Sequence, residues 1–340
     1  NHQPMKARDP ENINIFFIIG RPRAGTTLLR TLFDAHPNIT IPWECQYIVN
    51  LYSKYHRKTL WTEKELNEFY EDVIRQWQFR FWNVDFDKLR EDLLSRKGEI
   101  SYASLCKVVH SNFISFYDKT ELLLLGDKNP GYTIYTEKLL KVFPDARFIY
   151  ITRDYRDNLY SIKRIDFELP LASVVVYKWK YFLKQALKAQ RKHPEKVWIQ
   201  SYEDLVSDPE PEMQKLCDFL NIPFEAEMLN FYERRDEVRQ VMKTERAKKN
   251  HASLLHPIST KRIGMWKNHL SQPEVKMADF IAGGYAERAG YEPNYKVFGL
   301  FTRIKAIPGI TYARLLYLLT AMVNLFPYRL RSFVLSKGPL

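Results

Sequence analysis

The sequence predicts an α/β fold in which a mainly parallel sheet is flanked by helices. Three segments show the same order of patterns: a short apolar run, a polar turn, and residues with helical spacing. They are INIFFIIGRPRAGTTLLRTLF at residues 13–33, ARFIYITRDYRDNLYSIKR at 146–164 and KVWIQSYEDLVSDPEPEMQKLCDFL at 196–220. A strand covered on both faces is apolar along its length, and strands that alternate with helices usually form a parallel sheet.

The elements follow in order along the chain. Residues 1–14 are polar and form a lead-in, and the first apolar run predicts a buried strand that ends at Gly20. The next helix is expected to end near Pro37. Residues 55–120 are charged and in part have helical spacing, as in WTEKELNEFYEDVIRQW, and predict a helical insertion. ELLLLGDKNPGY contains a further apolar run followed by a turn, and another strand is expected over about 146–152.

Residues 301–340 are expected to form an amphipathic helical tail after a single α/β domain of residues 1–300. Within the tail, ITYARLLYLLTAMVNLF is mostly apolar, but it is interrupted by Arg314 and is short for a bilayer span. We expect it to pack on the body of the protein, with contact to a membrane surface as the alternative. Its basic flanking residues are Arg303, Lys305, Arg329, Arg331 and Lys337.

Composition limits the classes of partner. The 340 residues are 45% hydrophobic and 27% charged, as in ordinary globular proteins, whereas the formal net charge of +12 favours anionic partners. We expect no nucleic acid among them, because no nucleic-acid motif is recognisable and the basic residues are dispersed. Three scattered cysteines provide neither a disulfide framework nor a metal site, which favours a cytoplasmic location without a bound metal: Cys45, Cys106 and Cys217.

The first turn has the spacing of a phosphate-binding loop without its lysine. Gly20 and Gly25 give the pattern G-x-x-x-x-G, but the next residues are Thr26 and Thr27 where a nucleotide hydrolase has Lys followed by Ser or Thr. Positive charge instead lies inside the loop, at positions 21 and 23. Magnesium-dependent nucleotide chemistry is therefore disfavoured, while a guanidinium suits phosphate or sulfate oxygens.

The second turn supplies another arginine at a strand end. Arg153 follows the strand, and Ser161 lies eight residues later, about two turns into the next helix. Taken alone, Arg153 would more simply pair with Asp154 or Asp157 at the surface. Together with the first loop, we expect Arg153 and Ser161 to meet on a further phosphate.

These two motifs resemble those of the sulfotransferases that use 3′-phosphoadenosine-5′-phosphosulfate (PAPS). GRPRAGTT is similar to the loop of that family that binds the 5′-phosphosulfate, and FIYITRDYRDNLYSIKR to its 3′-phosphate motif. Both stand in the family's order and in a strand-turn-helix context. PRAGTTLLRTLFDAHPNITIPWE most resembles the tyrosylprotein type and its bacterial relatives, and the resemblance covers about residues 14–290.

The resemblance implies roles for individual residues. Glu44 would be the general base, Lys128 the cation of the transition state, and Arg23 a catalytic contact to the sulfuryl group. Arg153 and Ser161 would bind the 3′-phosphate. The remaining implied nucleotide contacts are Arg21, Arg23, Ala24, Gly25, Thr26, Thr27 and Tyr202. The small-molecule branch of the family has a histidine two residues after the lysine, where this chain has Pro130. That branch also has a late R-K-G motif, where this chain reads STKRIGMW. In this chain either Lys261 or Arg262 would supply the positive charge over the nucleotide.

The resulting hypothesis is transfer of a sulfuryl group from PAPS to an acceptor hydroxyl, leaving 3′-phosphoadenosine-5′-phosphate (PAP). Aromatic residues of the insertion and the apolar tail favour a hydrophobic acceptor such as a sterol, lipid or phenol, although core packing explains them almost as well. A protein tyrosine is the alternative acceptor. A P-loop kinase and a non-catalytic nucleotide-binding module are the alternatives to a sulfotransferase.

Overall fold

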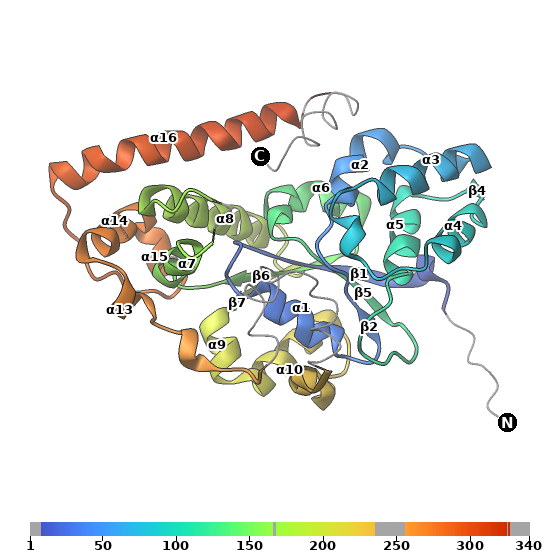
Figure 1. The fold of residues 1–340 in the computed structure, drawn as a ribbon, viewed down its shortest axis with the longest axis horizontal. Coiled ribbons are helices and arrows are strands. Elements are labelled where there is room, and N and C mark those ends of the chain that lie inside the picture. Colours follow the sequence, from blue (N-terminus) through green and yellow to red (C-terminus); the bar gives the residue numbers. More distant parts are fainter. Residues whose placement is uncertain (1–7, 166–167, 235–255, 325, 327–340) are drawn as a thin grey trace.

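A five-stranded parallel sheet forms the centre of the molecule (Figure 1). The computed structural model describes residues 8–165, 168–234, 256–324 and 326 of the 340. The predicted α/β fold is confirmed. The strands, in their order across the sheet, are β2 (Ile39–Thr40), β5 (Leu124–Lys128), β1 (Asn14–Gly20), β6 (Arg147–Thr152) and β7 (Val197–Ser201).

The strand order brings all the predicted motifs to one edge of the sheet. In the register, Ile18 on β1 pairs with Lys128 on β5, and Gly20 on β1 pairs with Ile151 on β6. The carboxyl ends of these strands therefore lie side by side. The strands that follow β1 in sequence lie on both sides of it, and parallel sheets bind ligands outside the carboxyl ends of strands at such a point.

Helices cover both faces of the sheet. Helices α1 (Thr26–Asp34), α9 (Tyr202–Ser207) and α10 (Pro209–Leu220) lie on one face, and α8 (Ala172–Lys192) lies on the other with the helices of the insertion (Figure 1). The remaining helices and 3-10 turns described are η1 (Pro10–Asn12), α2 (Tyr47–Tyr55), α3 (Glu63–Ile74), η2 (Phe79–Phe81), α4 (Phe86–Leu94), α5 (Tyr102–Ser111), η3 (Pro130–Tyr135), α6 (Thr136–Val142), α7 (Tyr155–Ile162), η4 (Ala226–Arg234), η6 (Thr260–Arg262), α13 (Trp266–His269), α14 (Gln272–Ala282), α15 (Gly284–Arg288) and α16 (Leu300–Val323).

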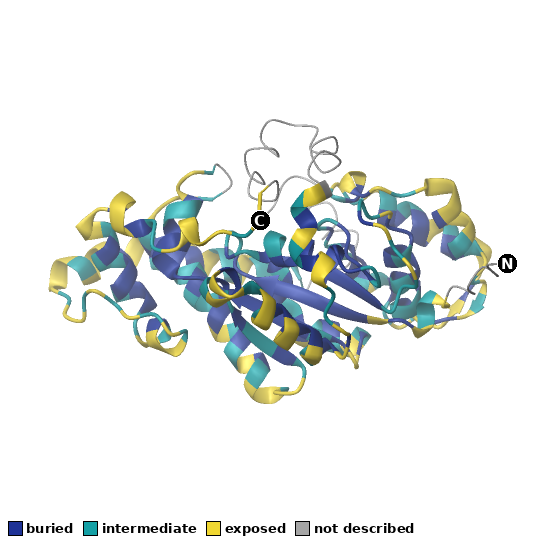
Figure 2. Ribbon diagram, turned by 90° about the horizontal axis from the view of Figure 1, so that it is seen from below, coloured by how far each residue is buried: buried dark blue, intermediate teal, exposed yellow. Residues whose placement is uncertain are grey.

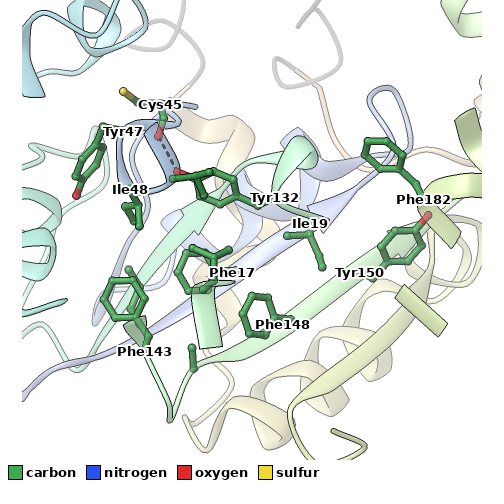
Figure 3. Close-up of a cluster of buried hydrophobic side chains, with 14 of the residues drawn as sticks. Phe17, Ile19, Cys45, Tyr47, Ile48, Tyr132, Phe143, Phe148, Tyr150 and Phe182 are labelled. Carbon is green, nitrogen blue, oxygen red and sulfur yellow. Dashed lines mark hydrogen bonds between the residues drawn. The ribbon is translucent and has the colours of Figure 1, made fainter. Parts of the chain in front are cut away.

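The continuous apolar run of β1 has a packing reason. Phe17 and Ile19 belong to the core on the α8 face, whereas Phe16 and Ile18 belong to the core on the α1 face. On the α8 face, Phe17 stacks on Phe148 with ring centroids 5.1 Å apart, as Figure 3 shows. The strands are buried in Figure 2, and exposed residues lie mainly on the outer surfaces of the helices.

The insertion is mainly helical but contains a short two-stranded antiparallel sheet that the sequence pattern did not indicate. Strands β3 (Leu60–Trp61) and β4 (Gly98–Glu99) pair in antiparallel fashion. Helix α3 begins at a capping box in which Thr62 and Glu65 satisfy each other's backbone amides, one reason for a well-defined helix start. Of the six aromatic residues at positions 69–82, four are buried in the core and thus serve packing: Phe69, Tyr70, Phe79 and Trp82.

Helix α16 is longer than the apolar stretch seen in the sequence. It begins at Leu300, continues through Pro308 and ends at Val323. Among the described residues it is the one helix with the length and apolar composition to cross a bilayer, yet it packs on α8 and α14. The predicted basic residues Arg329, Arg331 and Lys337 lie outside the described part of the chain.

Candidate active site

The loop between β1 and α1 is shaped as an anion-binding turn. Gly25 has φ of 107° and precedes α1, whose first turn has no side-chain cap. The amide groups of an uncapped first turn attract anions. Two hydrogen bonds fix the loop: Asn158 Nδ2 donates to the carbonyl of Pro22 (2.8 Å), and the amide of Gly20 donates to Thr133 Oγ1 (3.0 Å). Thr26 and Ala24 are buried in this turn.

A group of arginine side chains gathers beside the loop. Arg23, which has a positive φ of 69°, donates from Nε to Ser161 Oγ at 3.1 Å. Burial, and then the charges of Arg262, Arg153 and Arg164, lower the pKa of Arg23. Like charges held together in this way repel each other, so the cluster is suited to binding a multiply charged anion.

Arg153 is fixed by neutral groups rather than by a carboxylate. Its guanidinium donates to the carbonyls of Arg262 (2.6 Å) and Arg23 (3.4 Å), and it lies 4.6 Å from the ring centre of Tyr202. Among the described residues, its buried Nε has no hydrogen-bond partner. Trp179 Nε1 donates to the backbone carbonyl of Arg153 at 2.9 Å. The sequence alternative of pairing with Asp154 or Asp157 is not what the structure shows, since Asp154 pairs with Arg156.

Lys128 and Glu44 form an ion pair at the ends of the neighbouring strands β5 and β2. The side chain of Lys128 is 2% exposed and that of Glu44 is 38% exposed. Lys128 Nζ also donates to Thr27 Oγ1 of the loop at 3.4 Å. The buried cation therefore links the phosphate-binding loop to a carboxylate that solvent, or a second substrate, can reach.

A buried polar network supports this pair, and sequence reasoning missed it. Asp127 Oδ2 lies 3.1 Å from Nε2 of His110, whose Nδ1 lies 2.8 Å from the hydroxyl of Tyr47. Asn129 Nδ2 donates to Asp127 and, at 3.3 Å, to the carbonyl of Cys45. The residues beside Lys128 thus bind the residue beside Glu44. The neighbouring Tyr132–Cys45 contact is drawn in Figure 3. The only sequence signal for this network was the polar run GDKN at the end of an apolar strand.

The structure gives the partners of three further predicted contact residues. Arg21 is buried and pairs with Glu168. Lys261 and Arg262 are both exposed, and the charge of Arg262 acts on Arg23. The side chain of Arg23 contacts Ser161, and its carbonyl accepts from Arg153.

A groove of about 740 Å³ opens next to this site, but it does not include Glu44 or Lys128. Five of its lining residues are acidic and two are basic, so it does not suit an anion: Asp154, Asp157, Glu203, Asp204, Glu292, Arg156 and Lys267. Asp157 instead accepts hydrogen bonds from the amides of Gly264 (2.7 Å) and Trp266 (2.9 Å), which positions the Arg262 segment.

Fold and site together define a P-loop-like α/β protein in which arginines replace the Walker lysine. The chain belongs to the sulfotransferase family, whose model matches residues 16–226. It is 24% identical over 310 residues to protein-tyrosine sulfotransferase A of Caenorhabditis elegans, covering 86% of this chain and 72% of that protein. Protein-tyrosine sulfotransferase 1 of Danio rerio is 23% identical over 289 residues, covering 84% and 74%.

Solved structures show the same fold. The sulfotransferase domain of the curacin biosynthetic pathway matches with a TM-score of 0.54 and 23% identity, over 82% of this chain and 98% of that one. The sulfotransferase domain of the Synechococcus PCC 7002 olefin synthase matches with a TM-score of 0.51 and 20% identity, with the same coverage. The family expected from the sequence motifs is thus confirmed, and the chain is a sulfotransferase whose acceptor these similarities leave undetermined.

Proposed function

We propose that the protein transfers the sulfuryl group of PAPS to an acceptor hydroxyl, with Glu44 as the general base. One observation carries this proposal: two clusters of charged residues lie at the carboxyl ends of the strands. They are the arginine cluster beside the loop, and the Lys128–Glu44 pair that contacts the loop through Thr27. The first suits a nucleotide with several phosphates. The second provides a cation and a proton acceptor for transfer.

The residues present fit the donor. The buried Nε of Arg153 lacks a partner among the described residues, and with Ser161 and Arg262 it would hold the 3′-phosphate. The amides of residues 24–27 would hold the 5′-phosphosulfate. Arg23 lies between these groups, so we assign it to nucleotide phosphate in this geometry and keep its contact with the sulfuryl group as a prediction for the bound state. When bound, the donor supplies a sulfuryl group activated by its phosphate leaving group.

Lys128 and Glu44 are proposed to have separate roles in the transfer step. An acceptor hydroxyl loses its proton as it attacks, and the half-exposed carboxylate of Glu44 can take that proton at Oε1 or Oε2. Negative charge develops on the transferred group and on the bridging oxygen, and the buried ammonium of Lys128 is positioned to stabilise it. Their contact with each other holds both side chains at the end of the loop, where the acceptor and the sulfuryl group would meet.

The acceptor is proposed to be hydrophobic. The loop that carries Glu44 is held by the insertion, because Trp82 Nε1 donates to the carbonyl of Trp43 (2.7 Å) and the amide of Gln46 donates to Gln78 Oε1 (3.2 Å). Next to these contacts, Trp77 and Phe81 are 57% and 50% exposed. Aromatic surface beside the proposed base suits a phenol, sterol or lipid alcohol.

A tyrosine in an acidic protein segment is the second candidate. The net charge of +12 favours an anionic partner, and the curated relatives named above are protein-tyrosine sulfotransferases. Such an acceptor also presents a phenol to Glu44.

The experiment is transfer of labelled sulfuryl from PAPS to a panel containing a simple phenol, a sterol, a long-chain alcohol and an acidic tyrosine peptide. We expect labelled product with at least one phenol-bearing or hydrophobic alcohol. Glu44→Gln should lower turnover by roughly 10²–10⁴-fold while leaving PAP affinity unchanged. Glu63→Gln, an exposed carboxylate on α3, is the matched control. Full turnover in Glu44→Gln would show that another group is the base.

A further inference from the structure

Helix α16 turns its smallest residues toward the protein and its bulky apolar residues toward solvent. Its buried residues are Ala306, Gly309 and Ala313. A β-carbon added to Gly309 would lie 2.0 Å from Oγ of Ser173 on α8, so the two helices are in close contact. In Figure 1, α16 lies alongside α8. A surface helix of a soluble protein normally has the opposite arrangement, with its large apolar residues against the core.

The exposed apolar residues of α16 form a stripe along one side of the helix, with the exposed Thr311 between Ile307 and Leu315. At 3.6 residues per turn and 1.5 Å per residue, the stripe occupies one side of the helix over about 33 Å. Phe301 (70% exposed) and Leu319 (48%) widen it. An apolar surface of this size indicates a binding partner, unlike single exposed residues. The residues along its centre are between 53% and 73% exposed: Leu300, Ile304, Ile307, Leu315, Leu318 and Met322.

The charges of α16 indicate which partner fits. The helix has three basic residues, Arg303, Lys305 and Arg314, and no acidic residue. On the same helical projection, Arg303 and Arg314 border one edge of the stripe and Lys305 borders the other. Apolar surface edged by cations is typical of helices that lie in the interface of an anionic bilayer. The same face of a second copy of this chain would present no carboxylate to these cations.

Contacts on the inner side hold α16 parallel to the protein surface rather than projecting from it. The ring of Tyr317 stacks on Tyr181 of α8 with centroids 4.1 Å apart. Near the end of the helix, Asn324 Nδ2 donates to the hydroxyl of Tyr135 at 2.7 Å. In this position the helix offers one side to a membrane while its other side stays on the protein. We infer that α16 docks the protein on an anionic membrane surface, with the stripe among the headgroups and Arg303 and Lys305 on lipid phosphates.

Vesicle binding by the full chain tests this inference without reference to transfer activity. Co-sedimentation is measured with vesicles of 70:30 phosphatidylcholine and phosphatidylglycerol, and with phosphatidylcholine alone. We expect binding to the anionic vesicles that weakens with salt. The double variant Arg303→Gln/Lys305→Gln should weaken it by roughly 25-fold, from about fivefold for each charge. The matched control is Lys64→Gln/Lys97→Gln, which removes two exposed lysines from the insertion.

A second measurement reports on the stripe itself. The three native cysteines are buried, so a fluorescent label on Leu315→Cys can be compared with one on Leu60→Cys, an exposed residue of strand β3. Only the label at position 315 should show a blue shift when anionic vesicles are added. Absence of binding at low salt, or equal loss of binding in the lysine control, would overturn the inference. So would light scattering that shows a dimer converted to a monomer by Leu315→Gln/Leu318→Gln, because a second copy would then cover the stripe.

Discussion

Replacing Gly25 with alanine should disable the nucleotide site while leaving the rest of the fold intact. The added β-carbon would lie 2.5 Å from Cδ2 of Tyr202, whereas carbon atoms in contact are normally about 3.5–4.0 Å apart. The loop or the tyrosine ring must therefore move by roughly 1 Å. The ring of Tyr202 lies under the guanidinium of Arg153, so movement of either partner displaces the proposed 3′-phosphate clamp.

The free energy of unfolding that Gly25→Ala is expected to lose has two parts, backbone strain and an overpacked contact. A φ of 107° costs a non-glycine residue about 1–3 kcal/mol, and an overpacked contact costs about 1–3 kcal/mol more. Gly98→Ala is the matched control, because Gly98 also has a positive φ, 121°, but nothing lies within 4 Å of its added β-carbon. Only the first cost applies there.

The assay is calorimetric titration with PAP, accompanied by thermal unfolding of each variant. Gly25→Ala should bind PAP at least tenfold more weakly than the parent, a loss of about 1.4 kcal/mol, whereas Gly98→Ala should bind it normally. Gly98→Ala should lose about 1–4 °C in Tm, and Gly25→Ala about 3–8 °C, because its strain and overpacking costs add. Parental PAP affinity in Gly25→Ala would refute the placement of the nucleotide at this loop.

Two further predictions concern the charged groups. Arg153→Ala should weaken PAP binding by roughly 10- to 150-fold, the equivalent of about 1.5–3 kcal/mol for a charged hydrogen bond, and Arg23→Ala should do the same because it lies in the same cluster. Calorimetry checks both against Arg288→Ala, an exposed arginine on α15; unchanged affinity in Arg153→Ala would remove it from the clamp. Burial lowers the pKa of Lys119 to about 8. Because the unfolded chain then binds more protons than the folded chain above about pH 8, stability should rise with pH from about 8 toward 9.5, and Lys119→Met should flatten that rise in denaturant titrations.

The fold was predictable where the sequence carries local patterns. The central residues of β1 and β6 are buried on both faces, so residues 15–19 and 148–151 form apolar runs that are easily seen. The positions of Arg153 after β6 and of Ser161 on α7 were predictable for a related reason, since a strand end and the following helix are close in sequence. Strands β3 and β4 have two residues each, which is too short for any periodicity to appear, and 36 residues separate them.

The rest of the site depends on contacts between distant residues. Arg21 finds Glu168, 147 positions away, and no local pattern distinguishes it from Arg23. The Arg153 guanidinium binds the backbone carbonyl of Arg262, 109 positions away, and a contact between residues so far apart leaves no local pattern in the sequence. The packing of α16 on α8 depends on the close contact of Ser173 with Gly309. The exposure of the large residues of α16 could therefore not be predicted from its composition.

Titration of the protein with PAP in the presence of EDTA, alongside ATP with Mg²⁺, tests the central claim most directly. The arginine cluster and the absence of a Walker lysine predict that PAP binds without metal and more tightly than ATP–Mg²⁺. At a hundred times its dissociation constant, PAP should stabilise the fold by about 2.7 kcal/mol. Binding of ATP–Mg²⁺ with no binding of PAP would contradict the account.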